Sequence, residues 1–229
     1  MFDGNHNQLN AFEKGCAIVR WVKPTIIKMV GRDALDLLHR LTTKELLTVT
    51  PGTARRTVLT SNRGRVIDVF LVAHVSENTL LLISDSKDPT RTISAIDYFT
   101  IAEDSELKDL SDSQSRISLV GPKTHEVVAS VLGLSIESDK VVNMDYHGSE
   151  ATFSSDTSRG VTWVDVVIRS PEVGMLLALL SAGAVETNSD NFELFRILHQ
   201  IPGWDCEYGD HANPIEAGLY SLIDFDKGC

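Results

Sequence analysis

The feature that most constrains this fold is a unit that occurs twice: a strand, a Val-Gly pair and a helix. In the first copy, Val30-Gly31 stands between an apolar strand and residues 33–41, where apolar residues recur at helical spacing. In the second copy, Val120-Gly121 precedes a helix expected over residues 124–132. Glycine at such a position permits a tight exit that returns the helix onto its sheet. The repetition predicts two related sheet-plus-helix halves.

Short strands and helices fill the rest of the chain. Strands are expected over residues 17–22, 25–30, 57–60, 66–75, 79–84, 116–122, 140–144, 151–154 and 161–169. Further helices are expected over residues 90–99, 171–182 and 192–198, and the acidic residues 102–115 are typical of a connection. The turn-forming run at 61–65 joins two strands as a hairpin, which excludes a purely parallel doubly wound sheet.

The predicted fold class is therefore α+β, and the expected organisation has three parts. Residues 1–15 begin with a polar run and are expected to form a loose N-terminal arm. Residues 16–117 form the first α+β half and residues 118–229 the second, with boundaries that can interleave in space.

The charge of the chain argues against one class of partner. Lys and Arg number 21 against 32 Asp and Glu, a net charge of −11, whereas a general nucleic-acid surface needs clusters of basic residues. No apolar run reaches the ~18–20 residues of a membrane span. The N-terminus has neither the basic start nor the apolar core of a secretory signal. We therefore expect a cytoplasmic protein without a membrane partner.

The cysteines and histidines do not indicate a metal site. Cys16, Cys206 and Cys229 are too few and too scattered for a disulfide framework or a Cys-rich zinc site, so free thiols in a reducing compartment are expected. The seven histidines show no metal-ligand spacing. A glycine-rich phosphate-binding motif is also absent from the sequence.

Five short motifs follow one another in a family-specific order. They are Gly64-Arg65-Val66-Ile67-Asp68, Leu119-Val120-Gly121-Pro122-Lys123, Arg196 with Ile201-Pro202-Gly203, Asn213-Pro214-Ile215-Glu216-Ala217-Gly218-Leu219, and Lys227-Gly228-Cys229. Each is weak alone, but the ordered set resembles the aminomethyltransferase family of the glycine-cleavage T-proteins. Within that family, the Lys-Gly-Cys ending resembles the YgfZ-like folate-binding proteins.

This resemblance implies an architecture larger than the chain. It implies two ferredoxin-like lobes and a small C-terminal barrel around a central cavity that holds tetrahydrofolate. In YgfZ-like proteins the Lys-Gly-Cys motif continues with an aromatic residue, an aliphatic residue and Gly-Gln-Glu or Gly-Gln-Asp. Nothing follows Cys229 here. We therefore expect the sequence to be the front part of a longer protein, cut inside its own motif and lacking the barrel.

The resemblance also bears on catalysis. In the T-proteins the second Asp of a Gly-Gly-x-x-Asp-Asp hairpin contacts the folate nitrogen, where a carboxylate can act as acid or base. Aligned without gaps, Asp68 falls on the first Asp and Val69 on the second. Valine can neither accept nor deliver a proton, which argues against aminomethyl transfer. Asp68 is a possible catalytic or folate-binding residue, or a solvent-facing strand residue.

Four further residues are candidate folate contacts by the same resemblance. Asp165 matches a Glu that grips the pterin ring, a task that suits a carboxylate accepting two parallel hydrogen bonds. Arg196 could hold a pterin oxygen or a glutamate carboxylate, or form an ordinary ion pair. Ser84 replaces a family Asn that hydrogen-bonds folate. Arg65, like Arg55 and Arg56, is a candidate partner for the anionic polyglutamate tail, or an exposed charge without that role.

Two functions compete. The first is a tetrahydrofolate-binding protein of the YgfZ-like type that supports iron–sulfur protein assembly or repair, with iron–sulfur proteins as partners. The resemblance implies a reactive thiol at Cys229 in that case, with Lys227 as a cationic neighbour that would lower its pKa. The alternative is a tetrahydrofolate-dependent aminomethyltransferase. Val69 and the Lys-Gly-Cys ending favour the first. A third possibility is a stable scaffold that has lost function together with its barrel.

Overall fold

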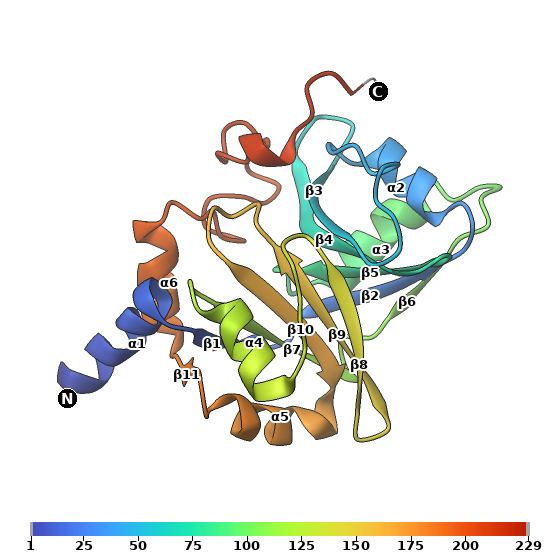
Figure 1. The fold of residues 1–229 in the computed structure, drawn as a ribbon. Coiled ribbons are helices and arrows are strands. Elements are labelled where there is room, and N and C mark those ends of the chain that lie inside the picture. Colours follow the sequence, from blue (N-terminus) through green and yellow to red (C-terminus); the bar gives the residue numbers. More distant parts are fainter. Residues whose placement is uncertain (1, 228–229) are drawn as a thin grey trace. The chain divides into compact units, whose positions relative to one another are not determined.

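A computed structural model describes residues 2–227 and divides the chain into two compact units, each built from two separate segments (Figure 1). The first unit contains residues 2–22 and 113–201, and the second contains residues 23–112 and 202–227. The chain therefore enters the first unit, leaves it after β1, and returns for the strands of its second segment.

The first unit is built around a six-stranded sheet in the order β11-β1-β7-β10-β9-β8. Its strands are β1 (Ala17–Arg20), β7 (Gln114–Val120), β8 (Val141–Tyr146), β9 (Ser149–Asp156), β10 (Trp163–Arg169) and β11 (Val185–Glu186). The pairing is antiparallel except between β1 and β11. Helices α4 (Thr124–Leu132) and α5 (Val173–Leu180), the latter preceded by the 3-10 turn η1 (Ser170–Glu172), pack on one face of this sheet (Figure 1).

The second unit is built around a five-stranded antiparallel sheet in the order β3-β4-β5-β2-β6. Its strands are β2 (Thr25–Val30), β3 (Ala54–Thr60), β4 (Val66–Ser76), β5 (Thr79–Ser84) and β6 (Glu106–Asp109). Helices α2 (Ala34–Leu41) and α3 (Pro89–Asp97) bury apolar side chains against one face. The opposite face packs against the C-terminal segment, which contains the 3-10 turn η2 (Tyr220–Leu222).

Both Val-Gly pairs require glycine because each glycine lies against a neighbouring backbone. Gly31 has φ +144° and Gly121 has φ +126°, conformations that residues with a Cβ rarely adopt. A Cβ at residue 31 would lie 1.9 Å from the carbonyl oxygen of Asp104, and one at residue 121 would lie 2.6 Å from that of Gly15. Both glycines lead directly into a helix that covers the sheet, as the sequence predicts.

The α+β class and the two sheet-plus-helix units are confirmed, but two segments differ from expectation. Residues expected to be a loose arm form helix α1 (Phe2–Lys14). Its Phe12 is buried and stacks on Phe195 of α6 (Ser189–Leu198), with ring centroids 4.3 Å apart. The acidic connection at 102–115 contains the edge strand β6, whose polar residues pair with β2 through backbone groups. Within residues 2–227, no helix is long and apolar enough to cross a membrane.

Candidate functional site

Asp165 lies at the centre of a buried charged cluster in the first unit. It stands on β10 between Val164 and Val166, both of which point into the core under α4 and α5. Because side chains alternate along a strand, Asp165 points to the opposite face. Its side chain is fully buried. The sequence interpretation placed Asp165 on the face away from the core, and the structure places it there without exposing it to solvent.

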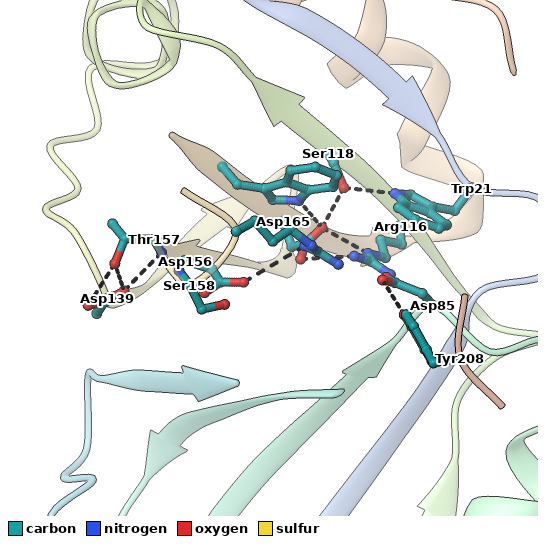
Figure 2. A network of polar contacts seen from close by, with 12 residues as sticks. Trp21, Asp85, Arg116, Ser118, Asp139, Asp156, Thr157, Ser158, Asp165 and Tyr208 are labelled. Carbon is teal, nitrogen blue, oxygen red and sulfur yellow. Dashed lines mark hydrogen bonds and ion pairs between the residues drawn. The ribbon is translucent and has the colours of Figure 1, made fainter. Parts of the chain in front are cut away.

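Arg116 on β7 holds this carboxylate through two parallel hydrogen bonds (Figure 2). Its Nε donates to Oδ1 at 2.8 Å and its Nη2 donates to Oδ2 at 3.0 Å, and the Arg116 side chain is also fully buried. Ser118 Oγ donates a short hydrogen bond to Oδ1, and Trp163 Nε1 donates to the same oxygen at 3.1 Å. Such a fork of paired N–H donors is the strongest arrangement that a carboxylate accepts from a side chain.

Two tryptophans flank the cluster. The guanidinium of Arg116 lies over the ring of Trp21, 4.0 Å from its centroid, and Trp21 Nε1 donates to Ser118 Oγ at 2.7 Å. The guanidinium of Arg159 lies over the ring of Trp163 at the same distance. Stacking of this kind holds each guanidinium in one plane. The two tryptophans therefore orient the guanidinium groups of the cluster.

A further polar residue, Ser154, lies beside Asp165 on the same sheet face. It pairs with Asp165 across β9 and β10, so the two side chains are direct cross-strand neighbours. Ser154 is fully buried, and its Oγ has no hydrogen-bond partner among residues 2–227. Buried hydroxyls nearly always have a partner, so this one is positioned to meet a water molecule or a polar ligand.

Asp68 forms a different kind of centre in the second unit. It is fully buried on the side of the sheet that α3 covers, and Thr92 of that helix donates to its Oδ2 at 2.5 Å. Ser84 Oγ and the backbone N–H of Val69 donate to Oδ1 at 2.5 and 2.7 Å. Burial raises the pKa of Asp68 to about 6, although the three hydrogen bonds oppose that shift. Asp68 is thus not solvent-facing, and its carboxylate ties α3 to the sheet.

Val69 points the other way, as alternation along a strand requires. It packs in an apolar cluster with Val58 and with residues of the C-terminal segment, among them Tyr208 and Leu219. At the position where the family resemblance places a catalytic carboxylate, this chain therefore presents a buried isopropyl group in an apolar setting.

Two of the predicted arginine contacts, Arg65 and Arg196, are engaged in ion pairs. Arg65 is exposed, and its Nη1 lies 3.0 Å from Glu216. Arg196 on α6 is buried, and its Nε donates to Glu193 at 2.7 Å while its Nη1 donates to the backbone carbonyl of Ile201 at 3.2 Å. The structure therefore gives Arg196 the ordinary ion pair that was the alternative to a ligand contact. Among the predicted site residues that the structure describes, Asp68 and Ser84 lie in direct contact within one unit.

The Lys-Gly-Cys motif begins with an anchored lysine. Lys227 Nζ donates short hydrogen bonds to the backbone carbonyls of His39 and Thr42 at the C-terminal end of α2. Positive charge there is favourable because it complements the helix dipole. Asp224 adds a second tie, through Lys44 Nζ at 2.5 Å. Cys229 lies outside the described residues, and the ammonium group expected to activate it is engaged by helix α2.

A cavity of about 400 Å³ lies in the second unit beside this segment. Thr60 and Gly64 of the β3–β4 hairpin and Ile215, Ile223 and Phe225 of the C-terminal segment are among its lining residues. Two of the five family motifs thus line the same hollow. Among its polar lining residues, Asn213 and Glu216 hydrogen-bond within the C-terminal segment or to Arg65.

Two cysteine thiols, those of Cys16 and Cys206, lie among the described residues. Cys16 is buried beside Thr124, and burial raises the pKa of its thiol to about 11, which makes it unreactive at neutral pH. Cys206 is exposed. Among residues 2–227, no group of three His, Cys, Asp or Glu side chains is placed to hold a metal ion.

Sequence reasoning did not identify Arg116, Ser154 or Thr92. A signal for Arg116 was present: in β7, Arg116 and Ser118 alternate with the apolar Ile117 and Leu119. That alternation shows that one face of the strand is polar. The register that brings this face against Asp165 is set by tertiary pairing, in which Ser118 stands opposite Asp165.

Comparisons with known proteins bear on the family and the fold of this chain. The GCVT N-terminal domain matches residues 1–155. A protein of Arabidopsis thaliana named as a putative chloroplastic transferase is 28% identical over 100% of this chain and 54% of its own length. An aminomethyltransferase of Natranaerobius thermophilus is 22% identical over 86% of this chain and 56% of its own length. The chain therefore spans about half the length of these curated relatives.

Solved structures confirm the fold. The glycine cleavage system aminomethyltransferase T from Bartonella henselae superimposes with a TM-score of 0.83 at 12% identity, covering 96% of this chain and 61% of that one. A chain of the heterotetrameric sarcosine oxidase from Corynebacterium sp. U-96 gives a TM-score of 0.55 at 13% identity, covering 77% of this chain and 88% of that one. At these identities the likeness is one of fold.

Proposed function

Because the chain belongs to the GCVT N-terminal domain family, we propose that it binds tetrahydrofolate or a derivative without transferring an aminomethyl group. The single observation that carries this proposal is Val69. The residue at the family's catalytic position is a buried valine among apolar neighbours. Proton transfer to or from the folate nitrogen needs an ionisable group there, and valine has none.

The neighbouring carboxylate does not replace the missing one. Asp68 lies on the helix-covered face and accepts hydrogen bonds from Ser84, Thr92 and the Val69 backbone. Moving it to the other face would shift the strand by one residue and turn every side chain of β4 over. The aminomethyltransferase alternative, which the names of several relatives suggest, therefore lacks its acid–base group in this chain.

For the pterin contact we propose Asp165. A buried carboxylate already accepting two parallel N–H donors has the geometry to accept the N–H edge of a 2-amino-4-oxopyrimidine ring. Ser154 offers a hydroxyl in need of a partner on the same face. Contacts from Ser84, Arg65 and Arg196 remain proposals, and each of these residues would have to exchange a present partner for the ligand, whereas Asp68 is proposed to hold α3 rather than the ligand.

The finer part of the proposal is a YgfZ-like role in which the folate-bound chain supports assembly or repair of iron–sulfur proteins. It is supported by the resemblance of the Lys227-Gly228-Cys229 motif alone. In this role the iron–sulfur cluster belongs to the partner protein and not to this chain. A cytoplasmic location likewise remains a prediction.

The test combines binding with turnover. Isothermal titration of the chain with tetrahydrofolate is expected to give micromolar affinity, about −8 kcal/mol. An aminomethyl-transfer assay with the same chain is expected to show no product above background. Transfer by the unmodified chain would overturn the non-catalytic proposal. The absence of any binding to the folded chain would overturn folate binding itself.

A further inference from the structure

The proposed function does not explain why Asp165 is already paired with Arg116. Both carboxylate oxygens already accept hydrogen bonds from Arg116, at 2.8 and 3.0 Å, with both side chains fully buried. The N–H edge of a pterin needs those same two oxygens. A carboxylate cannot offer one bidentate edge to two forks at once, so ligand and Arg116 compete.

We infer that Arg116 is an internal ligand of Asp165 that sets the affinity and selectivity of this site for compounds carrying an amidine-like edge. This inference rests on the proposed function, because it assigns the pterin to Asp165. A guanidinium presents two parallel N–H donors in a plane, and a 2-amino-4-oxopyrimidine presents the same pattern. Arg116 thus occupies the site with the hydrogen-bonding pattern of the ligand, and binding is an exchange of one fork for another.

The surroundings of Arg116 make this exchange selective. Its guanidinium stacks on Trp21, and the carboxylate keeps hydrogen bonds from Ser118 and Trp163 on Oδ1. After Arg116 withdraws, Asp165 therefore remains oriented, but it is a buried charge that needs a new bidentate donor. A ligand with only one N–H at the matching edge replaces only one of the two hydrogen bonds that Arg116 donates, so it cannot offset the loss of Arg116.

Ser154, on the neighbouring strand, offers a further polar contact beside Asp165. Its buried hydroxyl has no partner among residues 2–227, although it stands directly across the sheet from Asp165. With Arg116 in place, the closed pair satisfies both carboxylate oxygens but leaves this neighbouring hydroxyl unused. A ligand larger than a guanidinium that enters along the same face can supply the missing contact.

The competition can be measured with Arg116→Lys. Lysine retains the positive charge but makes a single point contact and lacks the planar fork. The apparent affinity of a site is proportional to the fraction of protein in the binding-competent state. Weakening the contact between Arg116 and Asp165 raises this fraction, and the apparent affinity for the ligand rises with it. We expect Arg116→Lys to bind tetrahydrofolate at least about tenfold more tightly than the unmodified chain. Arg169→Lys, on the same strand as Asp165 but half-exposed and paired with Glu172, is the matched control and should stay within about twofold.

Selectivity gives a second measurement. Pterin carries the 2-amino group, and lumazine has an oxygen in its place. The unmodified chain should bind pterin at least about tenfold more tightly than lumazine, and Arg116→Lys should narrow this ratio. Equal binding of both compounds by the unmodified chain would contradict the assignment of Asp165 to the ligand's N–H edge.

A third measurement needs no variant and therefore holds if Arg116→Lys fails to fold. The Nε–H of Arg116 should give a nuclear magnetic resonance signal that exchanges slowly with solvent, because its hydrogen bond to Asp165 is buried. Saturation with tetrahydrofolate is expected to abolish that slow exchange. Binding with the signal unchanged, or weaker binding by Arg116→Lys, would overturn the inference and leave the proposed function standing. No binding by either folded chain would overturn both.

Discussion

Asp165 and Asp68 are both fully buried on sheet strands, but their carboxylates face different chemical surroundings. Asp165 meets a guanidinium, an indole and a hydroxyl on the face of its sheet that α4 and α5 leave uncovered. Asp68 meets two hydroxyls and one backbone N–H on the face that α3 covers. The first is a charged pair, and the second is a carboxyl held by neutral donors.

This difference separates the proposed ligand site from a structural centre. A carboxylate paired with a fork of N–H donors can trade that fork for another. A carboxyl held by single hydroxyls under a helix has no such substitute, and desolvation without a cation raises its pKa. The Asp165 centre is therefore suited to bind, and the Asp68 centre is suited to hold α3 and to respond to pH.

The largest expected effect comes from removing one member of the charged pair. Asp165→Ala removes the carboxylate that accepts two hydrogen bonds from the buried guanidinium of Arg116, so we expect the free energy of unfolding to fall by about 3–5 kcal/mol. Chemical denaturation measures this value. Replacing both partners, Arg116→Met with Asp165→Leu, should recover most of the loss. A double variant as unstable as Asp165→Ala would show that the pair contributes more than compensated charge.

The next effect is a pH dependence that belongs to Asp68. Its pKa is about 6 in the folded chain against an ordinary value of 3.8, so the folded state binds more protons between these values. The stabilisation from protonated Asp68 is therefore fully present below a pH of about 4 and is lost as the pH rises to about 6, a change of about 3 kcal/mol.

The difference between the unmodified chain and Asp68→Asn isolates this contribution, because other titrating groups cancel. We expect the unmodified chain to lose about 3 kcal/mol relative to the variant between pH of about 4 and 6.5, measured by urea denaturation at each pH. A difference that stays constant across this range would mean that Asp68 titrates near its ordinary value, and the contrast between the two centres would weaken.

The smallest expected effect serves as the reference for both. Arg65 and Glu216 form an exposed ion pair outside the two buried centres. Arg65→Met should change the free energy of unfolding by less than about 1 kcal/mol, because solvent and salt screen such pairs. Thermal unfolding at low and high salt measures it. A loss comparable to that of Asp165→Ala would show that burial is not what distinguishes the centres.

Much of the fold could be predicted because its signals are local. The Val-Gly pairs locate two strand exits, and helix 124–132 and the strands at 25–30 and 79–84 match the structure at both ends. Helix α1 was missed because its formation depends on Phe12 stacking on Phe195, far away in the sequence. Strand β6 was missed because an edge strand with exposed polar side chains lacks an apolar pattern.

The candidate site was predictable only in part. Alternation placed Asp165 on the face opposite the core, as the structure has it, whereas the assignment of Val69 to the catalytic position stays a prediction. What the sequence could not provide was register: Ser118 stands opposite Asp165, and this pairing brings Arg116 within reach of the carboxylate. The burial of Asp68 was missed because it depends on a tertiary contact, the hydrogen bond that Thr92 of helix α3 donates to its carboxylate.

The central claim is that Asp165 binds the ligand and Asp68 does not, and two isosteric variants test it. Calorimetric titration with tetrahydrofolate should be made on the unmodified chain, on Asp165→Asn and on Asp68→Asn, near neutral pH and with folding verified. The account predicts that Asp165→Asn weakens binding at least about tenfold, about 1.4 kcal/mol, and that Asp68→Asn leaves it within about twofold. Strong loss in Asp68→Asn with undiminished binding in Asp165→Asn would contradict it.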